Sequence, residues 1–243
     1  AGGRADYIHL DVMDGQFVPN KTFDHTKIKE LRPLTLIPFD AHLMIDEPVK
    51  HVRDYIDAGS DIITVHAEVC DESSFGEICD MLHSNQVGIG LAINPDTELP
   101  EWCYKFVELL DQIIIMSVIP GKSGQKFIES THEKTKRIVK DLREHKFEGY
   151  IEADGGVNLE NIGTCFEDGA RAFVGGSAII GQNDVRMIIK EFRNQVLESR
   201  RKLLIKKAHE LGGMELVNQW IDLHVVGEKK DKLVQIAKEL GFQ

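Results

Sequence analysis

The residues best suited to chemistry near the start of the chain are His9 and Asp11, within the apolar stretch Tyr7–Gly15. If this stretch is a strand, its side chains alternate between two faces, so that His9, Asp11 and Met13 share one face and the intervening apolar residues form the other. An imidazole and a carboxylate two residues apart can share a divalent metal ion, although such a pair is also commonly just hydrogen bonded. The other metal ligands must therefore come from elsewhere in the chain.

Length and composition limit the classes of protein to consider. A chain of 243 residues with 42% hydrophobic residues fits one α/β barrel, or one domain with an appendage. The net charge of -11 argues against nucleic-acid binding but not against a phosphate ligand held by backbone N–H groups. With no long apolar run and no leader segment, we expect a cytoplasmic protein that binds no membrane. We expect reduced thiols, because no C-x-x-C spacing occurs among Cys70, Cys79, Cys103 and Cys165.

Apolar strand-like runs alternate with amphipathic helix-like segments along most of the chain. The predicted strands lie within Tyr7–Gly15, Ile37–Met44, Ile62–His66, Gly88–Ile93, Gln112–Val118, Tyr150–Asp154 and Ala172–Gly175. The segments between them predict helices, among them Pro48–Ala58, Ser73–Asn85, Gln125–His145 and Leu159–Gly169. Repeated βα units predict a parallel sheet, and this many of them favour a (β/α)₈ barrel over an open sheet.

One strand of such a barrel is absent from the predicted set. The opening Ala1–Asp6 is typical of a helix end running into a strand, so we expect the first βα unit to be missing. The barrel is predicted to occupy residues 1–196, and residues 197–243 to form a helical C-terminal extension. The extension predicts helices at Glu198–Leu211, Met214–Leu223 and Lys229–Leu240, with a strand at Asp222–Val226 as an alternative.

Polar residues follow the apolar part of several predicted strands. In a barrel these strand ends meet at the C-terminal face, where βα loops form active sites. Three strands would therefore bring together two imidazoles and two carboxylates: His9, Asp11, His42 and Asp154. This is a suitable ligand set for one divalent transition metal ion, and it suits zinc, iron, manganese and cobalt alike.

Glycine-rich turns follow the last three predicted strands, at Gly121–Gly124, Gly155-Gly156 and Gly176-Ser177. Unobstructed backbone N–H groups beside helix starts bind phosphate through their dipoles. Each turn by itself is also explained as a tight βα connection. Three in succession favour a phosphate site, in the part of a barrel where such sites are common.

Several short motifs together resemble the ribulose-phosphate 3-epimerase family, in the order in which that family carries them, from about Gly3 to Val196. They are His-Leu-Asp-Val-Met-Asp-Gly-x-Phe-Val-Pro-Asn, Asp-Ala-His-Leu-Met, Thr-Val-His-Ala-Glu, Asn-Pro-Asp-Thr, Met-Ser-Val-x-Pro-Gly-x-x-Gly-Gln-x-Phe, Asp-Gly-Gly-Val and Gly-Ser-Ala-Ile. The resemblance implies a (β/α)₈ barrel that interconverts D-ribulose 5-phosphate and D-xylulose 5-phosphate in the pentose phosphate pathway. We also predict a homo-oligomer.

The resemblance also implies roles for individual residues. The metal ligands would be His9, Asp11, His42 and Asp154, with Asp11 and Asp154 as the acid/base pair. Two opposed carboxylates suit this chemistry, because inverting a carbon next to a ketone removes a proton from one face and returns one to the other through a 2,3-enediolate. The substrate pocket would be lined by His42, Met13, Met44, Met116, Gly121, Lys122, Ser123, Gly124, Gly155, Gly156, Gly176 and Ser177.

Two features depart from the family pattern. Nothing before Tyr7 supplies the serine of the family's first strand, so we expect this chain to be weakly active or inactive beside a longer parent. Lys122 and Ser123 replace an aromatic residue and a glycine; Lys122 would favour a phosphate, and Ser123 would hinder the approach of the loop. His66 and Glu68 are expected to have structural roles. The alternatives are a related barrel enzyme acting on allulose 6-phosphate or 3-hexulose 6-phosphate, or an inactive sugar-phosphate-binding fragment.

Overall fold

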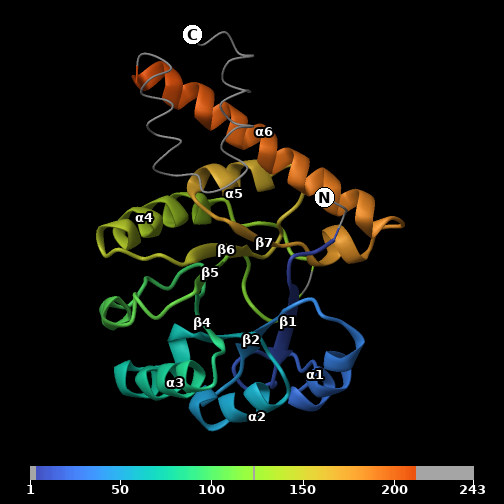
Figure 1. The fold of residues 1–243 in the computed structure, drawn as a ribbon, viewed down its shortest axis with the longest axis vertical. Helices are drawn as coiled ribbons and strands as arrows, with labels where there is room; N and C mark the ends of the chain where they lie inside the picture. The colour runs from blue at the N-terminus through green and yellow to red at the C-terminus, as the bar shows by residue number, and fades with distance from the viewer. Residues whose placement is uncertain (1–3, 123, 212–243) are drawn as a thin grey trace.

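The computed structural model describes residues 4–122 and 124–211, which form a barrel of parallel strands surrounded by helices (Figure 1). Seven strands pair side by side in chain order. They are β1 (Ile8–Met13), β2 (Phe39–Met44), β3 (Ile62–His66), β4 (Gly88–Ile93), β5 (Gln112–Met116), β6 (Tyr150–Asp154) and β7 (Ala172–Val174). The predicted parallel barrel is therefore confirmed, and in this part of the chain β1 and β7 are the two edges of the sheet.

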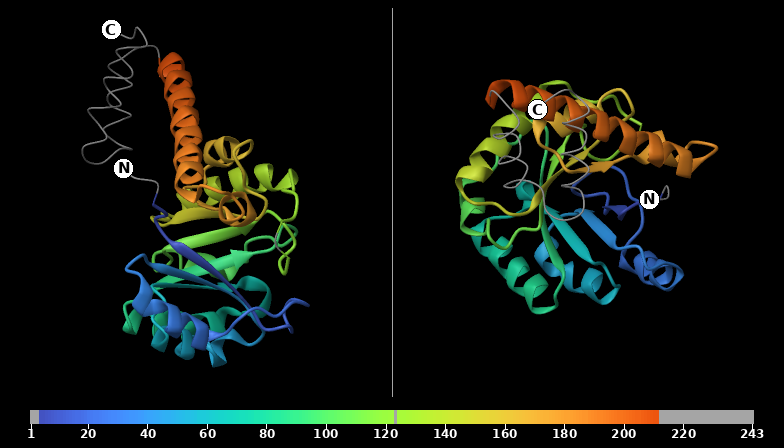
Figure 2. Two further views of the ribbon diagram at one scale, coloured as in Figure 1. Left: turned by 90° about the vertical axis from the view of Figure 1, so that its right-hand side faces the viewer. Right: turned by 45° about the horizontal axis from the view of Figure 1, so that its top comes forward.

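The helices lie outside the ring of strands (Figure 2). They are α1 (His25–Leu31), α2 (Val52–Asp57), α3 (Glu72–Ser84), α4 (Ser130–Glu144), α5 (Ile162–Asp168) and α6 (Val185–Leu211). Helix α1 lies in a segment for which no helix bounds were predicted, and α2 begins later than predicted because Pro48–Lys50 form a 3₁₀ turn. Helix α3 begins close to its predicted start, where Asp71 and Ser74 cap it reciprocally.

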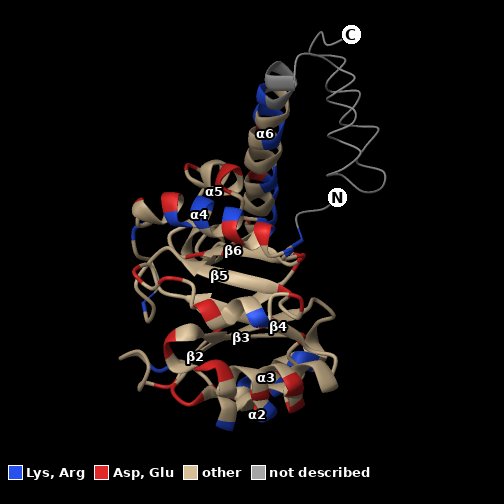
Figure 3. Cartoon of the chain, turned by 90° about the vertical axis from the view of Figure 1, so that its left-hand side faces the viewer, with Lys and Arg blue, Asp and Glu red and all other residues tan. Residues whose placement is uncertain are grey.

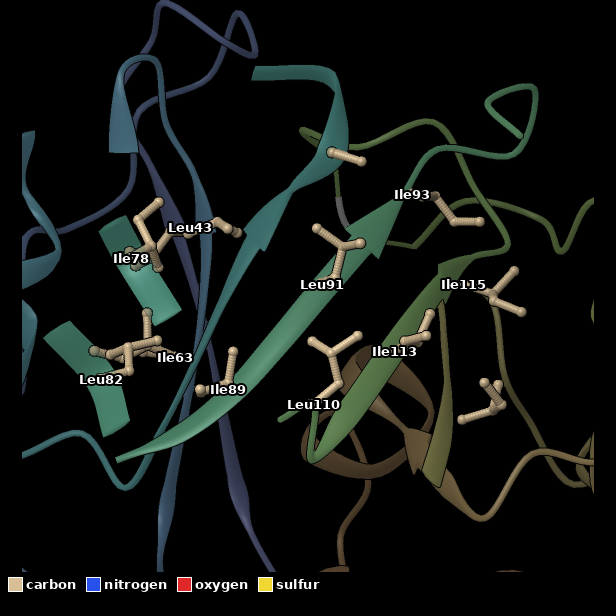
Figure 4. Close-up of a cluster of buried hydrophobic side chains, with 14 of the residues drawn as sticks. Leu43, Ile63, Ile78, Leu82, Ile89, Leu91, Ile93, Leu110, Ile113 and Ile115 are labelled. Carbon is tan, nitrogen blue, oxygen red and sulfur yellow. The ribbon is translucent and has the colours of Figure 1, made fainter. Parts of the chain in front are cut away.

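The main hydrophobic core lies between the strands and the helices (Figure 4). Leu91 and Ile113 on the strands are fully buried in this layer, together with Ile78 and Leu82 of helix α3. Burying an Ile or Leu side chain contributes about 1.5–3 kcal/mol, so this layer fixes the outward face of each strand. Because side chains alternate along a strand, the neighbouring residues must point into the barrel, where the polar groups lie.

Helix α6 continues through the predicted domain boundary at residues 196 and 197 and projects beyond the barrel (Figure 1). The predicted start of a separate helix at Glu198 is therefore wrong, although the division into two domains stays a prediction. Helix α6 packs on α5, and the Arg193 guanidinium donates to the Asp6 carboxylate at 2.8 Å, so α6 also holds the segment before β1. The predicted elements at Met214–Leu223, Asp222–Val226 and Lys229–Leu240 lie outside the described residues.

Helix α4 carries basic and acidic residues side by side, whereas the charged residues of α6 are mostly basic (Figure 3). On α4, for example, Lys136 pairs with Glu133 at 2.8 Å on the exposed face. Within residues 4–122 and 124–211, no helix combines the length and the apolar composition needed to cross a bilayer.

Candidate active site

The C-terminal ends of the strands surround a cavity of about 410 Å³, which is within the usual size range of small-molecule sites. Its wall includes the three methionines predicted to line it, Met13, Met44 and Met116. Met13 and Met44 are directly paired in the register of β1 and β2, and both are buried. These three methionines form an apolar part of the wall that carries no acidic protons.

Four polar side chains meet at the strand ends beside this cavity: His9, Asp11, His42 and Asp154. Three of them line the cavity, whereas His42, which was predicted to line it, is fully buried and is not part of its wall. Each offers one ligand atom, and these atoms all lie within 4.8 Å of one another. The Nδ1 atom of His42 lies 3.2 Å from Oδ1 of Asp11 and 3.4 Å from Oδ2 of Asp154. Two imidazole nitrogens and two carboxylate oxygens from three strands form a donor set that fits a divalent transition metal ion.

The alternation of β1 explains how two of these groups face the cavity. Leu10 and Val12 are buried in the outer core, so His9 and Asp11 must point inward. Parallel pairing places Asp11 beside His42 of β2, and β6 brings in Asp154 from its last position. The sequence pattern thus specifies which face each residue occupies, and the barrel brings the faces together.

The charges of the cluster stabilise one another. Burial alone would lower the pKa of His42, but hydrogen bonds with Asp11 and Asp154 raise that pKa to about 9. Burial would also lower the pKa of His9, but the charge of Asp40 and the hydrogen bonds with Asp11, Asp40 and Glu152 together raise it well above its usual value. The pKa of Asp11 is held below its usual range by both histidines despite burial. Because a metal ion binds the neutral imidazole, binding at this cluster would release protons.

His66 of β3 is not one of the four cluster residues but contacts the cluster directly, with its Nε2 atom 2.8 Å from Nε2 of His42. Its ring stacks on that of His42 with an interplanar angle of 19° and a centroid distance of 4.9 Å. Its Nδ1 lies 3.1 Å from Glu68, whose other oxygen accepts a hydrogen bond from the backbone N–H of Asn94. Burial would raise the pKa of Glu68, but the bond with His66 and those from the following loop lower it to about 2. This geometry supports the structural roles predicted for His66 and Glu68.

The glycine-rich turns form the rim of the cavity. All the turn residues predicted to line the substrate pocket do line it, except Ser123, which lies outside the described residues. At Gly156 the backbone has φ of 65°, and a Cβ there would lie 2.5 Å from the Phe127 nitrogen. Only glycine therefore lets the turn after β6 approach the loop after β5 this closely. From the β1 loop, the Asn20 side-chain amide donates to the Gly121 carbonyl and connects the two sides of the rim.

A second polar layer lies directly below the four-residue cluster, and it was not among the predicted site residues. The Nδ1 atom of His9 lies 2.8 Å from Asp40, and Gln112 and Glu152 complete this layer. A sequence signal exists for two of these residues, because Asp40 and Glu152 each stand two positions before a cluster residue on the same strand face. No comparable motif singles out Gln112.

Comparison with known proteins identifies relatives along most of the chain. The model of the ribulose-phosphate 3 epimerase family matches residues 2–180. A ribulose-phosphate 3-epimerase of Bacillus subtilis is 41% identical over 192 residues, covering 79% of this chain and 87% of the relative. The chloroplastic ribulose-5-phosphate-3-epimerase of Arabidopsis thaliana is 42% identical, covering 76% of this chain and 66% of the relative. An Escherichia coli ribulose-phosphate 3-epimerase is 38% identical over 79% of this chain and 84% of its own length.

Solved structures with low sequence identity share the fold. KGPDC from Streptococcus mutans superposes with a TM-score of 0.61 at 11% identity, covering 79% of this chain and 86% of the other. A 3-hexulose-6-phosphate synthase gives a TM-score of 0.57 at 17% identity, covering 78% of this chain and 86% of the other. These likenesses show the barrel architecture alone.

Proposed function

The chain belongs to the ribulose-phosphate 3-epimerase family and is thus an isomerase, and we propose that Asp11 and Asp154 carry out the proton transfers that interconvert D-ribulose 5-phosphate and D-xylulose 5-phosphate. Family membership confirms the predicted resemblance and the predicted enzyme class. The observation that carries the assignment of residues is the convergence of these two carboxylates, from β1 and β6, at the inner end of the cavity.

The two carboxylates divide the chemistry between opposite faces of the substrate carbon. One removes the C3 proton on its side, a 2,3-enediolate forms, and the other returns a proton on the opposite side. The low pKa of Asp11 keeps this group ionised, which is the form a general base requires. The buried imidazoles of His9 and His42 lie between the carboxylates and hold their oxygens in place.

We propose that His9, Asp11, His42 and Asp154 hold one divalent ion. When bound, such an ion supplies Lewis-acid stabilisation of the negative charge that develops on the substrate oxygens, typically several kcal/mol. The donor set suits zinc, iron, manganese or cobalt. Burial of His42 and its hydrogen bonds to both carboxylates keep the ligands in a fixed arrangement, which reduces the reorganisation needed on binding.

We assign the phosphate to the rim formed by Gly121, Gly124, Gly155-Gly156 and Gly176-Ser177, where backbone N–H groups border the cavity. Lys122 adds a positive charge at this rim, in a chain whose net charge is -11. The methionines of the wall surround the reacting carbons with polarizable, non-acidic groups. Cytoplasmic localisation and a homo-oligomeric state are proposed together with this function.

The comparisons do not favour the alternative substrates. The relatives at 36–42% identity described as ribulose-phosphate 3-epimerases cover most of the chain, whereas the 3-hexulose-6-phosphate synthase shares only the fold. Family membership and the presence of the four proposed ligands favour an enzyme over a silent binding protein.

The two-carboxylate assignment is tested by exchange of the C3 proton in heavy water with Asp11→Asn and Asp154→Asn. Each variant should lose epimerisation, by about 10²–10⁴-fold, because one of the two proton transfers is removed. Each should retain exchange with a different epimer, since the remaining carboxylate still reaches one face. Metal content is measured in parallel, so that loss of the ion is distinguished from loss of the base. Equal exchange of both epimers in either variant would show that a single base serves both faces.

A further inference from the structure

The second polar layer below the cluster forms a continuous chain of hydrogen bonds across the barrel. The Tyr150 hydroxyl donates to Oε1 of Gln112 at 2.7 Å, and Nε2 of Gln112 donates to Oδ1 of Asp40 at 2.8 Å. The other oxygen of Asp40 lies 2.8 Å from Nδ1 of His9. Asp40 and Gln112 are almost completely buried, so neither group exchanges these partners for bulk water.

The barrel interior is shaped to hold this chain. Gly90 of β4 lies between Thr64 and Gln112, and a Cβ at Gly90 would come within 2.0 Å of the Thr64 hydroxyl oxygen and 3.0 Å of Gln112 Cγ. The absence of a side chain at Gly90 thus makes room for Gln112 to reach Asp40 from the opposite side of the barrel. The Thr64 hydroxyl accepts a second hydrogen bond from Gln112 at 2.7 Å.

The direction of each bond follows from the groups involved. Nε2 of Gln112 is a donor only, so the Asp40 oxygen that it contacts must accept. The remaining oxygen of Asp40 is also an acceptor, so the hydrogen between Asp40 and His9 is on Nδ1 of the imidazole. The lone pair of a neutral His9 is then on Nε2, the atom that lies 3.4 Å from Asp11 and 3.7 Å from Asp154.

We propose that Asp40, oriented by Gln112, is a positioning residue that fixes the hydrogen on Nδ1 of His9 and thereby presents Nε2 to the metal ion. The inference rests on the proposed function only in taking His9 as a metal ligand. A carboxylate behind a ligating imidazole orients the ring and increases its basicity, and its loss typically lowers metal affinity about 10–100-fold.

Replacing Asp40 by Asn provides a specific test because Gln112 determines how the new amide is oriented. With Gln112 held in its orientation by the Tyr150 hydroxyl, which donates to Oε1, the oxygen of the new amide faces the Gln112 donor, so its NH₂ group faces Nδ1 of His9. Two donors then oppose each other, and the ring favours the tautomer whose hydrogen is on Nε2, where it blocks coordination. Glu152, whose oxygen lies 3.2 Å from Nδ1, is the other acceptor within reach and would limit the loss.

A second substitution should reverse the effect. In the Asp40→Asn/Gln112→Glu double variant, the carboxylate introduced at position 112 accepts from Tyr150, from Thr64 and from the NH₂ group of the amide introduced at position 40. The oxygen of that amide then turns toward His9 and again accepts the hydrogen on Nδ1. The double variant has the same net charge as the natural chain, so rescue would depend on the direction of the hydrogen bonds and not on charge.

The experiment measures the affinity for Co²⁺ and Zn²⁺ by competition with a chromophoric chelator, in the full chain and without substrate. Asp40→Asn should weaken binding about 10–100-fold, and the double variant should recover most of that loss. The matched control is Thr64→Val, an isosteric change in the same layer that leaves the Asp40–His9 contact intact and should change affinity less than about twofold.

Three results would overturn the proposal: unchanged affinity in Asp40→Asn, no recovery in the double variant, or an equal loss in Thr64→Val. If Asp40→Asn does not fold, Gln112→Leu tests the same link, because Asp40 then loses its orienting donor; unchanged affinity there would also overturn it. Failure of the proposed function is distinguishable, since the unsubstituted chain would then bind neither ion or would bind it without epimerising the substrate.

Discussion

Two buried histidine–aspartate pairs in this molecule look alike but have different surroundings. His9 pairs with Asp40 inside the barrel, and His132 pairs with Asp168 between helices α4 and α5. The histidine side chains are 11% and 14% exposed, and each aspartate side chain is 2% exposed. The pairing and the burial are therefore nearly the same in both places.

The neighbours of each pair make the difference. The free nitrogen of His9 faces carboxylates from β1 and β6 beside a cavity of about 410 Å³. The free nitrogen of His132 lies 3.6 Å from the exposed Glu129 of the same turn, and the adjacent cavity is about 10 Å³, the size of one water molecule. A buried His–Asp pair is thus a candidate ligand site only where other strands direct further donors at it. The His132 pair serves to hold α4 against α5.

The largest expected difference is between the catalytic activities of variants in the two pairs. His9→Asn should lower kcat/KM at least about 10³-fold, because it removes one of the four proposed metal ligands and disturbs both carboxylates. His132→Ala should change kcat/KM less than about threefold, since that ring lies outside the cavity wall. Steady-state assays of ribulose 5-phosphate epimerisation check both variants, and a large loss in His132→Ala would contradict the separation of roles.

Added metal ion should raise the free energy of unfolding through the site at His9 and not through the His132–Asp168 pair. An ion present at 100 times its dissociation constant adds about 2.7 kcal/mol to the free energy of unfolding when it binds the native state alone. Urea unfolding of the chelated chain with and without added Zn²⁺ should show this gain. The gain should be lost in His9→Asn and retained in His132→Ala. An equal gain in both variants would place the ion elsewhere.

Breaking the His132–Asp168 pair should lower the stability of the protein and leave its activity nearly unchanged. His132→Ala leaves the buried Asp168 carboxylate with Lys136, 3.5 Å away, as its remaining ionic partner. We expect the free energy of unfolding to fall by about 1–3 kcal/mol, measured by urea denaturation. Adding Asp168→Asn should recover part of this loss, because it removes the poorly paired charge. Unchanged stability in His132→Ala would show that the pair contributes nothing.

The contribution of the Glu68–His66 contact to the free energy of unfolding should depend on pH. The folded-state pKa of Glu68 is lowered to about 2 from a usual value of 4.5, so its ionised form stabilises the fold above pH 4.5. This contribution is lost as the pH falls from about 4.5 toward 2. The difference in urea midpoint between the unsubstituted chain and Glu68→Gln should therefore be greatest at pH 6 and decrease by pH 3. A constant difference across that range would argue against a role for the charge.

The smallest expected effect is at the rim of the cavity. Lys122 is exposed there, and exposed charges are screened by salt, so Lys122→Met should raise KM only a few-fold at low ionic strength with little change in kcat. The KM values of Lys122→Met and of the unsubstituted chain should become equal at high salt. Gln125, whose side-chain amide braces the same loop through the Ile119 and Lys122 carbonyls, provides a contrast. Its replacement by Ala should raise KM at every salt concentration.

Much of the site follows from local pattern. The period of two along β1 predicts that His9 and Asp11 face one way, and the structure places both beside His42 and Asp154. The glycine turns were found for a comparable reason, because a close backbone approach such as that at Gly156 requires glycine whatever the distant contacts are. Helix boundaries were less accurate: α6 begins well before its predicted start, since nothing local ends it at the predicted domain boundary.

The sequence by itself determined the strand pattern, the inward face of β1 and the identity of the four cluster residues. Only the tertiary structure decided that Gln112 of β5 meets Asp40 of β2, and that His132 meets Asp168 rather than a ligand. The physical reason is that alternation and turn chemistry act between residues close together in the chain. Contacts across the barrel depend on the curvature of all the strands and on the register in which they pair, and no short stretch of sequence carries that information.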